Sequence, residues 1–330
     1  MKEAGSAKSS RKANIWLAIL GIVILVVLSL FVPWNTSGFT SQPHPVRDYS
    51  EAVARIEALS SRYGPTLNPD CATRFLTHGE KVARVLVFVH GYTNCPQQFA
   101  ELGERFYELG DNVLIAPLPH HGYADRMTGE QAELKAEELI AYADEMVDIA
   151  QGLGEEVVMV GISGGGVTTA WAAQNRPDLD LAVVISPAFA YQQIPTALTA
   201  PVMNVYLVTP NSFEWWDPAK QEAIGPEHAY PRYATHALVQ FLRLGFAVRR
   251  GARRSPPAAG AILVVTNASD TTVNNDVVYE VTGNWRAHGA NLTTFEFGAE
   301  LHLGHDLIDP AQEDQQVDIV YPQLMALILR

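Results

Sequence analysis

Residues 155–173, EEVVMVGISGGGVTTAWAA, constrain the fold of this chain more than any other stretch. The apolar run at 157–160 predicts a buried β-strand, and a helix-like segment follows the Gly-Ile-Ser-Gly-Gly that comes next. A Gly-x-Ser-x-Gly pattern between a strand and a helix places Ser163 in a sharp turn with a strained backbone and an exposed hydroxyl. Gly161 and Gly165 flank the serine where a Cβ would clash with the neighbouring chain. Taken alone, the pattern also fits an ordinary strand-to-helix turn.

Length and charge limit the remaining possibilities. A chain of 330 residues with 48% hydrophobic content suits one large α/β domain with an insertion, or two small domains. The net charge of −13 argues against nucleic acid as a partner. We find no internal repeat and no long low-complexity tract in the sequence.

The N-terminal region contains a long apolar run at residues 15–33, IWLAILGIVILVVLSLFVP, which has no charged residue. About 20 apolar residues span a bilayer as a helix. The preceding residues 1–14 are basic, with Lys2, Lys8, Arg11 and Lys12 against Glu3. Basic flanks stay in the cytoplasm, so we predict a single-pass transmembrane anchor with an extracytoplasmic catalytic domain. A cleaved signal peptide and a buried core helix are the alternatives; signal peptides usually have about 7–15 apolar residues and an A-x-A-like cleavage site, which we do not find here.

Strands and helices are predicted to alternate along the rest of the chain. Apolar, β-branched runs predict further strands at 84–89, 112–116, 181–186, 261–266 and 292–297. Helical spacing predicts helices at 49–63, 97–109, 130–151, 273–288 and 312–329. Residues 66–81 are expected to be irregular. This alternation predicts a mostly parallel central sheet with helices on both faces.

The alternation breaks at residues 187–260, which are rich in aromatic residues and prolines and carry a net positive charge. We predict that this stretch is an inserted cap, with some of its aromatic residues lining an acyl pocket. The arginine-rich run 249–254 fits a solvated loop or a contact with anionic lipid headgroups. The predicted domains are a basic tail (1–14), the anchor (15–33), a linker with an N-terminal extension (34–80), the first part of the core (81–186), the cap (187–260) and the second part of the core (261–330).

A reactive serine needs a base to take its proton, and a third group must hold that base. In open α/β sheets these groups lie on loops after the C-terminal ends of strands. The loop after the 261–266 strand carries Asp270, and the loop after the last strand carries His305. His302 is the alternative base and Asp276 the alternative third group.

These motifs resemble the α/β-hydrolase superfamily, in particular bacterial carboxylesterases and monoacylglycerol lipases. The resemblance covers the chain from about residue 84 to the C-terminus, apart from the cap, and rests on VHGYT, PHHG, GISGG, the loop Asp and GHDLID. It implies an α/β-hydrolase fold in which Ser163 is the nucleophile, His305 the base and Asp270 the residue that orients it. It also implies an oxyanion hole formed by the backbone N–H groups of Tyr92 and Gly164.

We therefore expect a serine hydrolase that cleaves small or lipid-like carboxylic esters through an acyl-enzyme, without a cofactor. The alternatives are an amidase, thioesterase or acyltransferase on the same triad, or a non-catalytic interaction protein that keeps the fold. His90 is expected to be structural. His120 and His121 are expected near the site, but no ligand-spaced acidic or cysteine partner favours a metal there.

The chain has two cysteines, Cys71 and Cys95, and both lie in the part predicted to be exported. An even number of cysteines in an oxidising compartment permits one disulfide. Cys95 lies three residues beyond Tyr92, in the loop expected to supply an oxyanion donor. Two free thiols, one of them buried, are the alternative.

Overall fold

The computed structural model describes residues 3–62, 64–223 and 225–330, with side chains described from residue 14 onward. Within these ranges the centre of the protein is a seven-stranded sheet in the order β1-β3-β2-β4-β5-β8-β9. The strands are β1 (Arg74–Leu76), β2 (Val82–Val89), β3 (Asn112–Ile115), β4 (Gly154–Ile162), β5 (Leu181–Ile185), β8 (Ala261–Asn267) and β9 (Leu292–Phe297). All pairings are parallel except that of β1 with β3, so the predicted mostly parallel sheet is confirmed.

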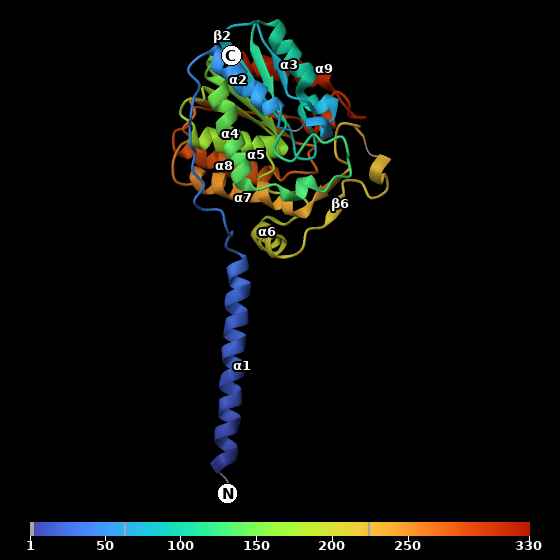
Figure 1. Ribbon diagram of the computed structural model, residues 1–330. Coiled ribbons are helices and arrows are strands. Elements are labelled where there is room, and N and C mark those ends of the chain that lie inside the picture. The colour runs from blue at the N-terminus through green and yellow to red at the C-terminus, as the bar shows by residue number, and fades with distance from the viewer. Residues whose placement is uncertain (1–2, 63, 224) are drawn as a thin grey trace.

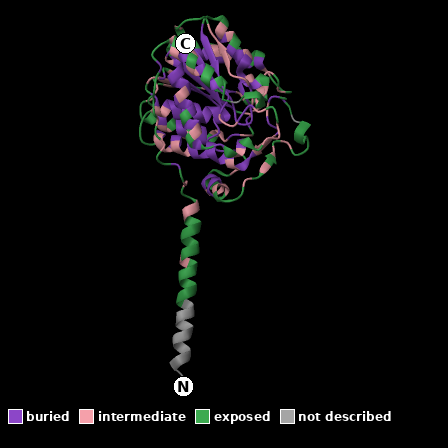
Figure 2. Ribbon diagram, in the orientation of Figure 1, coloured by how far each residue is buried: buried purple, intermediate pink, exposed green. Residues whose placement is uncertain are grey.

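Helices cover both faces of this sheet, as predicted (Figure 1). Along β2, Val85 and Val87 pack into one layer while Leu86 and Phe88 pack into the other, because successive side chains of a strand point to opposite faces. The first layer contains α2 (Tyr49–Ser60), α4 (Ala136–Ala150), α5 (Ser163–Asn175), α7 (Thr235–Ala252) and α8 (Asn275–Ala287), and the second contains α3 (Ala100–Glu108) and α9 (Val317–Ile328). Figure 2 shows the buried residues concentrated where these layers meet the sheet.

Two local predictions are wrong. The single helix predicted for 130–151 is divided into a 3₁₀ turn, η4 (Glu130–Glu133), and α4. The break occurs because Lys135 is extended (φ −123°, ψ 148°) and its N–H donates to Glu138 Oε2 at 2.8 Å, which caps a new helix. Residues 66–81 are not wholly irregular either, because β1 pairs with β3 at the edge of the sheet.

The insertion at 187–260 has two parts. The helix α7 packs against α5 in the first helical layer. Two other elements lie outside that layer, α6 (Thr199–Val208) and the antiparallel pair of β6 (Phe213–Trp215) and β7 (Arg232–Ala234) (Figure 1). The domain boundaries given above remain predictions.

The predicted linker binds the surface of the domain. Ser41 Oγ and the N–H of Gln42 donate to the carboxylate of Asp144 at 2.5 and 2.7 Å, and the N–H of His44 donates to Asp148 at 2.8 Å. The fully buried Arg176 also binds both carboxylates, at 3.2 and 2.6 Å. The carboxylates of Asp144 and Asp148 therefore hold the linker against the domain. The polar composition of the linker alone does not predict this contact.

The N-terminal helix α1 (Glu3–Leu30) projects away from the rest of the protein (Figure 1). Of the predicted basic tail, residues 1–2 and the side chains of 3–13 lie outside the described residues. Within the described part of the chain, none of the helices combines the length and the hydropathy that a membrane span requires. The predicted transmembrane anchor is therefore not confirmed.

Candidate active site

The predicted nucleophile lies in the turn between β4, which ends at Ile162, and α5, which begins at Ser163. Ser163 has a φ of +57°, a left-handed conformation that costs free energy for a residue with a side chain. A Cβ on Gly161 would lie 2.3 Å from the carbonyl oxygen of Gly165, and one on Gly165 would lie 2.2 Å from that of Val89. Both glycines are thus required by close backbone contacts. Ser163 as a whole residue is 8% exposed, and it lines a cavity that the insertion helps to enclose.

Asp270 and His305 lie together on the loops after β8 and β9. Asp270 Oδ2 lies 2.7 Å from His305 Nδ1, and Asp270 Oδ1 accepts hydrogen bonds from the N–H groups of Thr272 (2.8 Å) and Val273 (3.0 Å). Burial alone would raise the pKa of Asp270, but the positive charge available to His305 and these hydrogen bonds lower it below its usual value. The carboxylate is therefore ionised and fixed in orientation.

The other nitrogen of His305 is left for proton transfer. Because Nδ1 donates to Asp270, Nε2 carries the free lone pair of the neutral ring. It is buried and has no hydrogen-bond partner within the described residues. Burial alone would lower the pKa of His305, but the charge of Asp270 and its hydrogen bond raise it above the usual value. His305 and Ser163 line the same cavity.

The alternatives to this pair lie elsewhere. His302 is exposed and has a φ of +50° at the end of the 3₁₀ turn η7 (Ala299–Leu301). Asp276 is exposed in the first turn of α8. The structure thus brings Asp270 to His305 and leaves His302 and Asp276 on the surface.

The two predicted oxyanion donors border this turn. Gly164 is in the first turn of α5, where backbone N–H groups have no helical carbonyl to bind and the helix dipole favours negative charge. Tyr92 follows β2 and lines the cavity with Ser163. The Tyr92 hydroxyl donates to Gln131 Oε1 at 2.7 Å and accepts from the N–H of Ala234 at 2.8 Å. The buried side chain of Tyr92 therefore holds the loop after β2 in place. This role of Tyr92 was not predicted from the sequence.

The cavity next to Ser163 has a volume of about 170 Å³. Its walls include aromatic side chains from the insertion, Tyr191, Trp216 and Tyr230, as predicted for an acyl pocket, and polar side chains, Thr93, Asn94, Asp306 and Gln312. Burial raises the pKa of Asp306 to about 6, and Gln98 and Gln312 each donate a hydrogen bond to its carboxylate at 3.1 Å. The cavity lining thus combines aromatic side chains with polar ones.

The remaining histidines of the region have structural contacts. His90 Nε2 accepts from the N–H of Leu118 at 2.9 Å, so Nδ1 carries the proton that is donated to the Gly91 carbonyl. Burial and the neighbouring His121 lower the pKa of His90 well below its usual value. His120 lies near Glu130 and Glu138 on the protein surface. In residues 3–62, 64–223 and 225–330 there is no group of three or more His, Cys, Asp or Glu side chains that could hold a metal ion.

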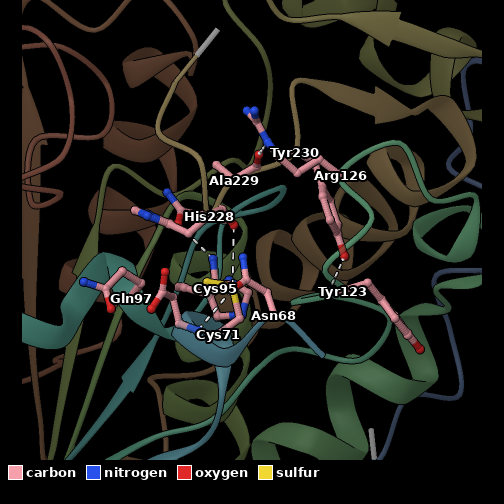
Figure 3. The surroundings of a disulfide bond; sticks show 12 residues. Asn68, Cys71, Cys95, Gln97, Tyr123, Arg126, His228, Ala229 and Tyr230 are labelled. Carbon is pink, nitrogen blue, oxygen red and sulfur yellow. Dashed lines mark hydrogen bonds between the residues drawn. A yellow bond between two sulfur atoms is a disulfide. The ribbon is translucent and has the colours of Figure 1, made fainter. Parts of the chain in front are cut away.

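A disulfide joins Cys71 and Cys95 beside the cavity (Figure 3). Figure 3 shows it near His228, whose carbonyl oxygen lies 3.6 Å from Cys71 Sγ, and the next two residues, Ala229 and Tyr230, line the cavity. The carboxylate of Asp309 accepts from Asn94 at 3.2 Å and lies 3.1 Å from His228 Nε2. These contacts connect three loops around the cavity. These contacts of His228 and Asp309 could not be predicted from the sequence, because they join distant segments.

Comparison with known proteins identifies a family and several solved structures that are similar to this chain. A sequence profile of the Hydrolase_4 family, described as serine aminopeptidase, S33, matches residues 80–276. Among solved structures, the metagenome-derived lipolytic enzymes LipS and LipT give a match with a TM-score of 0.60 and 19% identity, covering 80% of this chain and 99% of that chain. The monoacylglycerol lipase of Paleococcus ferrophilus matches with a TM-score of 0.58 and 18% identity, covering 78% and 97%.

A third similar structure is a soluble variant of monoglyceride lipase from Saccharomyces cerevisiae in complex with a substrate analog. Its TM-score is 0.57 at 12% identity, and the match covers 78% of this chain and 90% of that chain. No curated protein matches the chain in a sequence comparison. At these identities the solved structures establish the fold.

The sheet topology, the strained serine turn and these matches define an α/β hydrolase. More particularly, the chain belongs to the S33 serine aminopeptidase family of hydrolases. The matched region contains Ser163 and Asp270 and ends before His305.

Proposed function

We propose that the protein is a serine esterase. Ser163 attacks the carbonyl carbon of a carboxylic ester while His305 Nε2 takes the hydroxyl proton, and Asp270 stabilises the resulting imidazolium. His305 then gives that proton to the leaving alcohol, and later activates a water molecule that hydrolyses the acyl-Ser163 intermediate. The N–H groups of Tyr92 and Gly164 bind the oxyanion. The observation that carries this proposal is the 2.7 Å contact between His305 Nδ1 and Asp270, which leaves His305 Nε2 without a partner among the described residues. His305 lines the same cavity as Ser163.

The proposed substrates are esters with short to medium acyl chains. A cavity of about 170 Å³ is below the roughly 300–1,000 Å³ of pockets for drug-sized ligands. Its aromatic walls favour an apolar acyl group, and its polar residues favour an alcohol group that forms hydrogen bonds. The lipolytic enzymes and monoacylglycerol lipases among the similar structures are consistent with ester substrates.

The test is hydrolysis of p-nitrophenyl esters of increasing chain length by the wild type and by Ser163→Ala. We expect the highest kcat/KM for short to medium acyl chains, with lower values for acetate and for long-chain triacylglycerol. The Ser163→Ala protein should remain folded and lose the activity. Activity confined to peptides or to insoluble triacylglycerol would contradict the proposal, and so would near wild-type rates in Ser163→Ala.

We also propose that residues 15–33 anchor the protein in a membrane, with the N-terminus in the cytoplasm and the catalytic domain outside. The support is the uncharged apolar run after basic residues, together with Trp16 and Trp34 at its two ends, where aromatic side chains favour the membrane interface. Most apolar side chains of α1 from Ile15 onward are exposed. A reporter fused after Arg330 should be extracytoplasmic and the protein should resist carbonate extraction. A soluble mature form that begins near Asn35 would instead indicate a cleaved signal peptide.

A further inference from the structure

The end of α1 is held by one buried side chain of the insertion. Asn204, on α6, is fully buried. Its amide nitrogen donates to the carbonyl oxygens of Leu30 and Val32, both at 2.8 Å, and its Oδ1 accepts from the N–H of Trp34 at 3.0 Å. The segment that leaves α1 is therefore bonded to α6 through three hydrogen bonds. Figure 1 shows α6 beside the domain end of α1.

Beside Asn204, α6 and the turn before it carry exposed apolar side chains. Leu198, Val205 and Val208 are 43%, 41% and 71% exposed, respectively. They are separated by seven and three residues, which places them on one side of a helix. Met203 and Asn204 lie on the buried side. The exposed side chains thus form an apolar patch on α6, the helix that binds the end of α1 through Asn204.

Two arginines near this end of the domain have no acidic partner. Arg249 and Arg253, on the last turns of α7, share Glu280 at 2.9 and 2.5 Å. Arg250 instead binds the side chain and carbonyl oxygens of Thr36, two residues beyond Trp34. Arg254 is exposed, and neither it nor Arg250 has a carboxylate partner among the described residues. This is an uncompensated positive charge on a chain with a net charge of −13.

We propose that this end of the catalytic domain rests on the surface of a bilayer that contains anionic lipids. The contact surface consists of Leu198, the last residue of the 3₁₀ turn η5 (Thr196–Leu198) before α6, Val205 and Val208 of α6, and Arg250 and Arg254. The inference depends on the proposed anchoring of α1. If residues 15–33 span the bilayer, Trp34 lies at its interface, and α6 must lie at the same depth because Asn204 bonds it to that segment.

The arginines are placed to add an electrostatic attraction. Arg250 is tied to Thr36, only a few residues from the predicted membrane boundary, and anionic headgroups attract cations within about a Debye length of the surface. Apolar side chains of a helix lying in the interface bury among the headgroups and upper acyl chains. The bilayer would therefore contact the same insertion that supplies Tyr191 and Trp216 to the cavity.

The proposal can be tested with a fluorophore on α6 in the full-length chain. Both native cysteines are in the disulfide, so a single Val208→Cys substitution can be labelled specifically with an environment-sensitive dye. The protein is reconstituted in phosphatidylcholine vesicles, with or without phosphatidylglycerol, that contain spin-labelled quencher lipids. The control is Ile319→Cys, which is 45% exposed on α9, at the end of the domain far from α1 (Figure 1).

We expect several-fold stronger quenching at position 208 than at 319, and stronger quenching at 208 when phosphatidylglycerol is present. Arg250→Gln with Arg254→Gln should remove the effect of phosphatidylglycerol. Equal, weak quenching at both positions in protein that floats with the vesicles would overturn the contact surface while leaving the anchor intact. Protein that fails to float would overturn the anchor and the contact surface together, whereas ester hydrolysis is measured independently of both.

A second variant tests the role of Asn204. Asn204→Asp keeps the size and the acceptor for Trp34 N–H but loses the two donors to Leu30 and Val32. We expect it to float like the wild type while quenching at position 208 falls to nearer the control value. Asn284→Asp, on α8, serves as the matched substitution and should leave quenching unchanged. Unchanged quenching in Asn204→Asp would contradict the role of Asn204 in fixing α6 at the membrane.

Discussion

Gly165→Ala should disrupt both folding and catalysis, because the new Cβ would meet backbone atoms that have no space to move. It would lie 2.2 Å from the carbonyl oxygen of Val89 and 2.4 Å from that of His90, whereas ordinary contacts are 3.4 Å or more. Relief of these contacts requires α5 and the end of β2 to separate by about 1 Å. That movement displaces Ser163 relative to Tyr92, which lies three residues beyond the end of this strand.

The expected destabilisation is at least the roughly 1–3 kcal/mol typical of an overpacked core, because both clashing atoms are backbone atoms at the end of the central strand β2. A displacement of about 1 Å at a catalytic group can lower the rate about a hundredfold. The assays are denaturant unfolding and hydrolysis of a p-nitrophenyl ester by the protein that remains folded. We expect a lower unfolding midpoint together with a lower kcat.

Gly283→Ala is the matched control, since a Cβ at this position in α8 would meet no atom within 4 Å. An alanine there should stabilise the helix by about 0.5–1 kcal/mol and leave activity unchanged. Wild-type stability and wild-type rate in Gly165→Ala would refute the close packing of the serine turn against β2.

Three further predictions concern the proposed triad and the disulfide. Asp270 raises the pKa of His305, and the base works when it is neutral, so the kcat/KM of the wild type should rise with pH through a pKa above about 6.5. In Asp270→Asn this rise should move to lower pH, and the rate should fall by about 10⁴. An unshifted pH–rate profile in this variant would contradict the prediction. His305→Ala should abolish ester hydrolysis while His302→Ala has a mild effect, and the reverse order of severity would assign the base to His302. Cys95→Ser should lower the free energy of unfolding by about 3 kcal/mol, because it opens a bridge between cysteines 24 positions apart, and an unchanged denaturation midpoint relative to wild type would exclude that contribution.

The central strands and the serine turn could be predicted because their signals are local. Apolar runs such as 157–160 are long enough to indicate buried strands, and the two glycines around Ser163 report contacts made within a few residues. The edge strand β1 was missed because three residues that pair at an edge show no clear period. The break at Lys135 was missed because it depends on one side-chain cap within an otherwise helical sequence.

The contacts that Asn204 and Arg176 make with other segments could not be predicted from the sequence. In the sequence, Asn204 is a polar residue within an apolar helix, and nothing near it in the chain indicates a partner. Its hydrogen bonds to the end of α1 depend on how the two helices lie in the fold. Arg176 is buried among acidic side chains from α4 and from its own loop, although arginine is usually exposed. The pairing of Asp270 with His305 was predicted from chain order and loop position, but its geometry depends on how β8 and β9 lie together.

The identity of the nucleophile is the central claim, and labelling by a fluorophosphonate probe tests it most directly. The probe phosphonylates a serine only when a neighbouring base activates it, and peptide mapping by mass spectrometry locates the adduct. We predict a single adduct on Ser163 in the wild type and none in a folded Ser163→Ala protein. An adduct on another residue, or no adduct in protein that is folded and at a pH where His305 is neutral, would contradict the assignment.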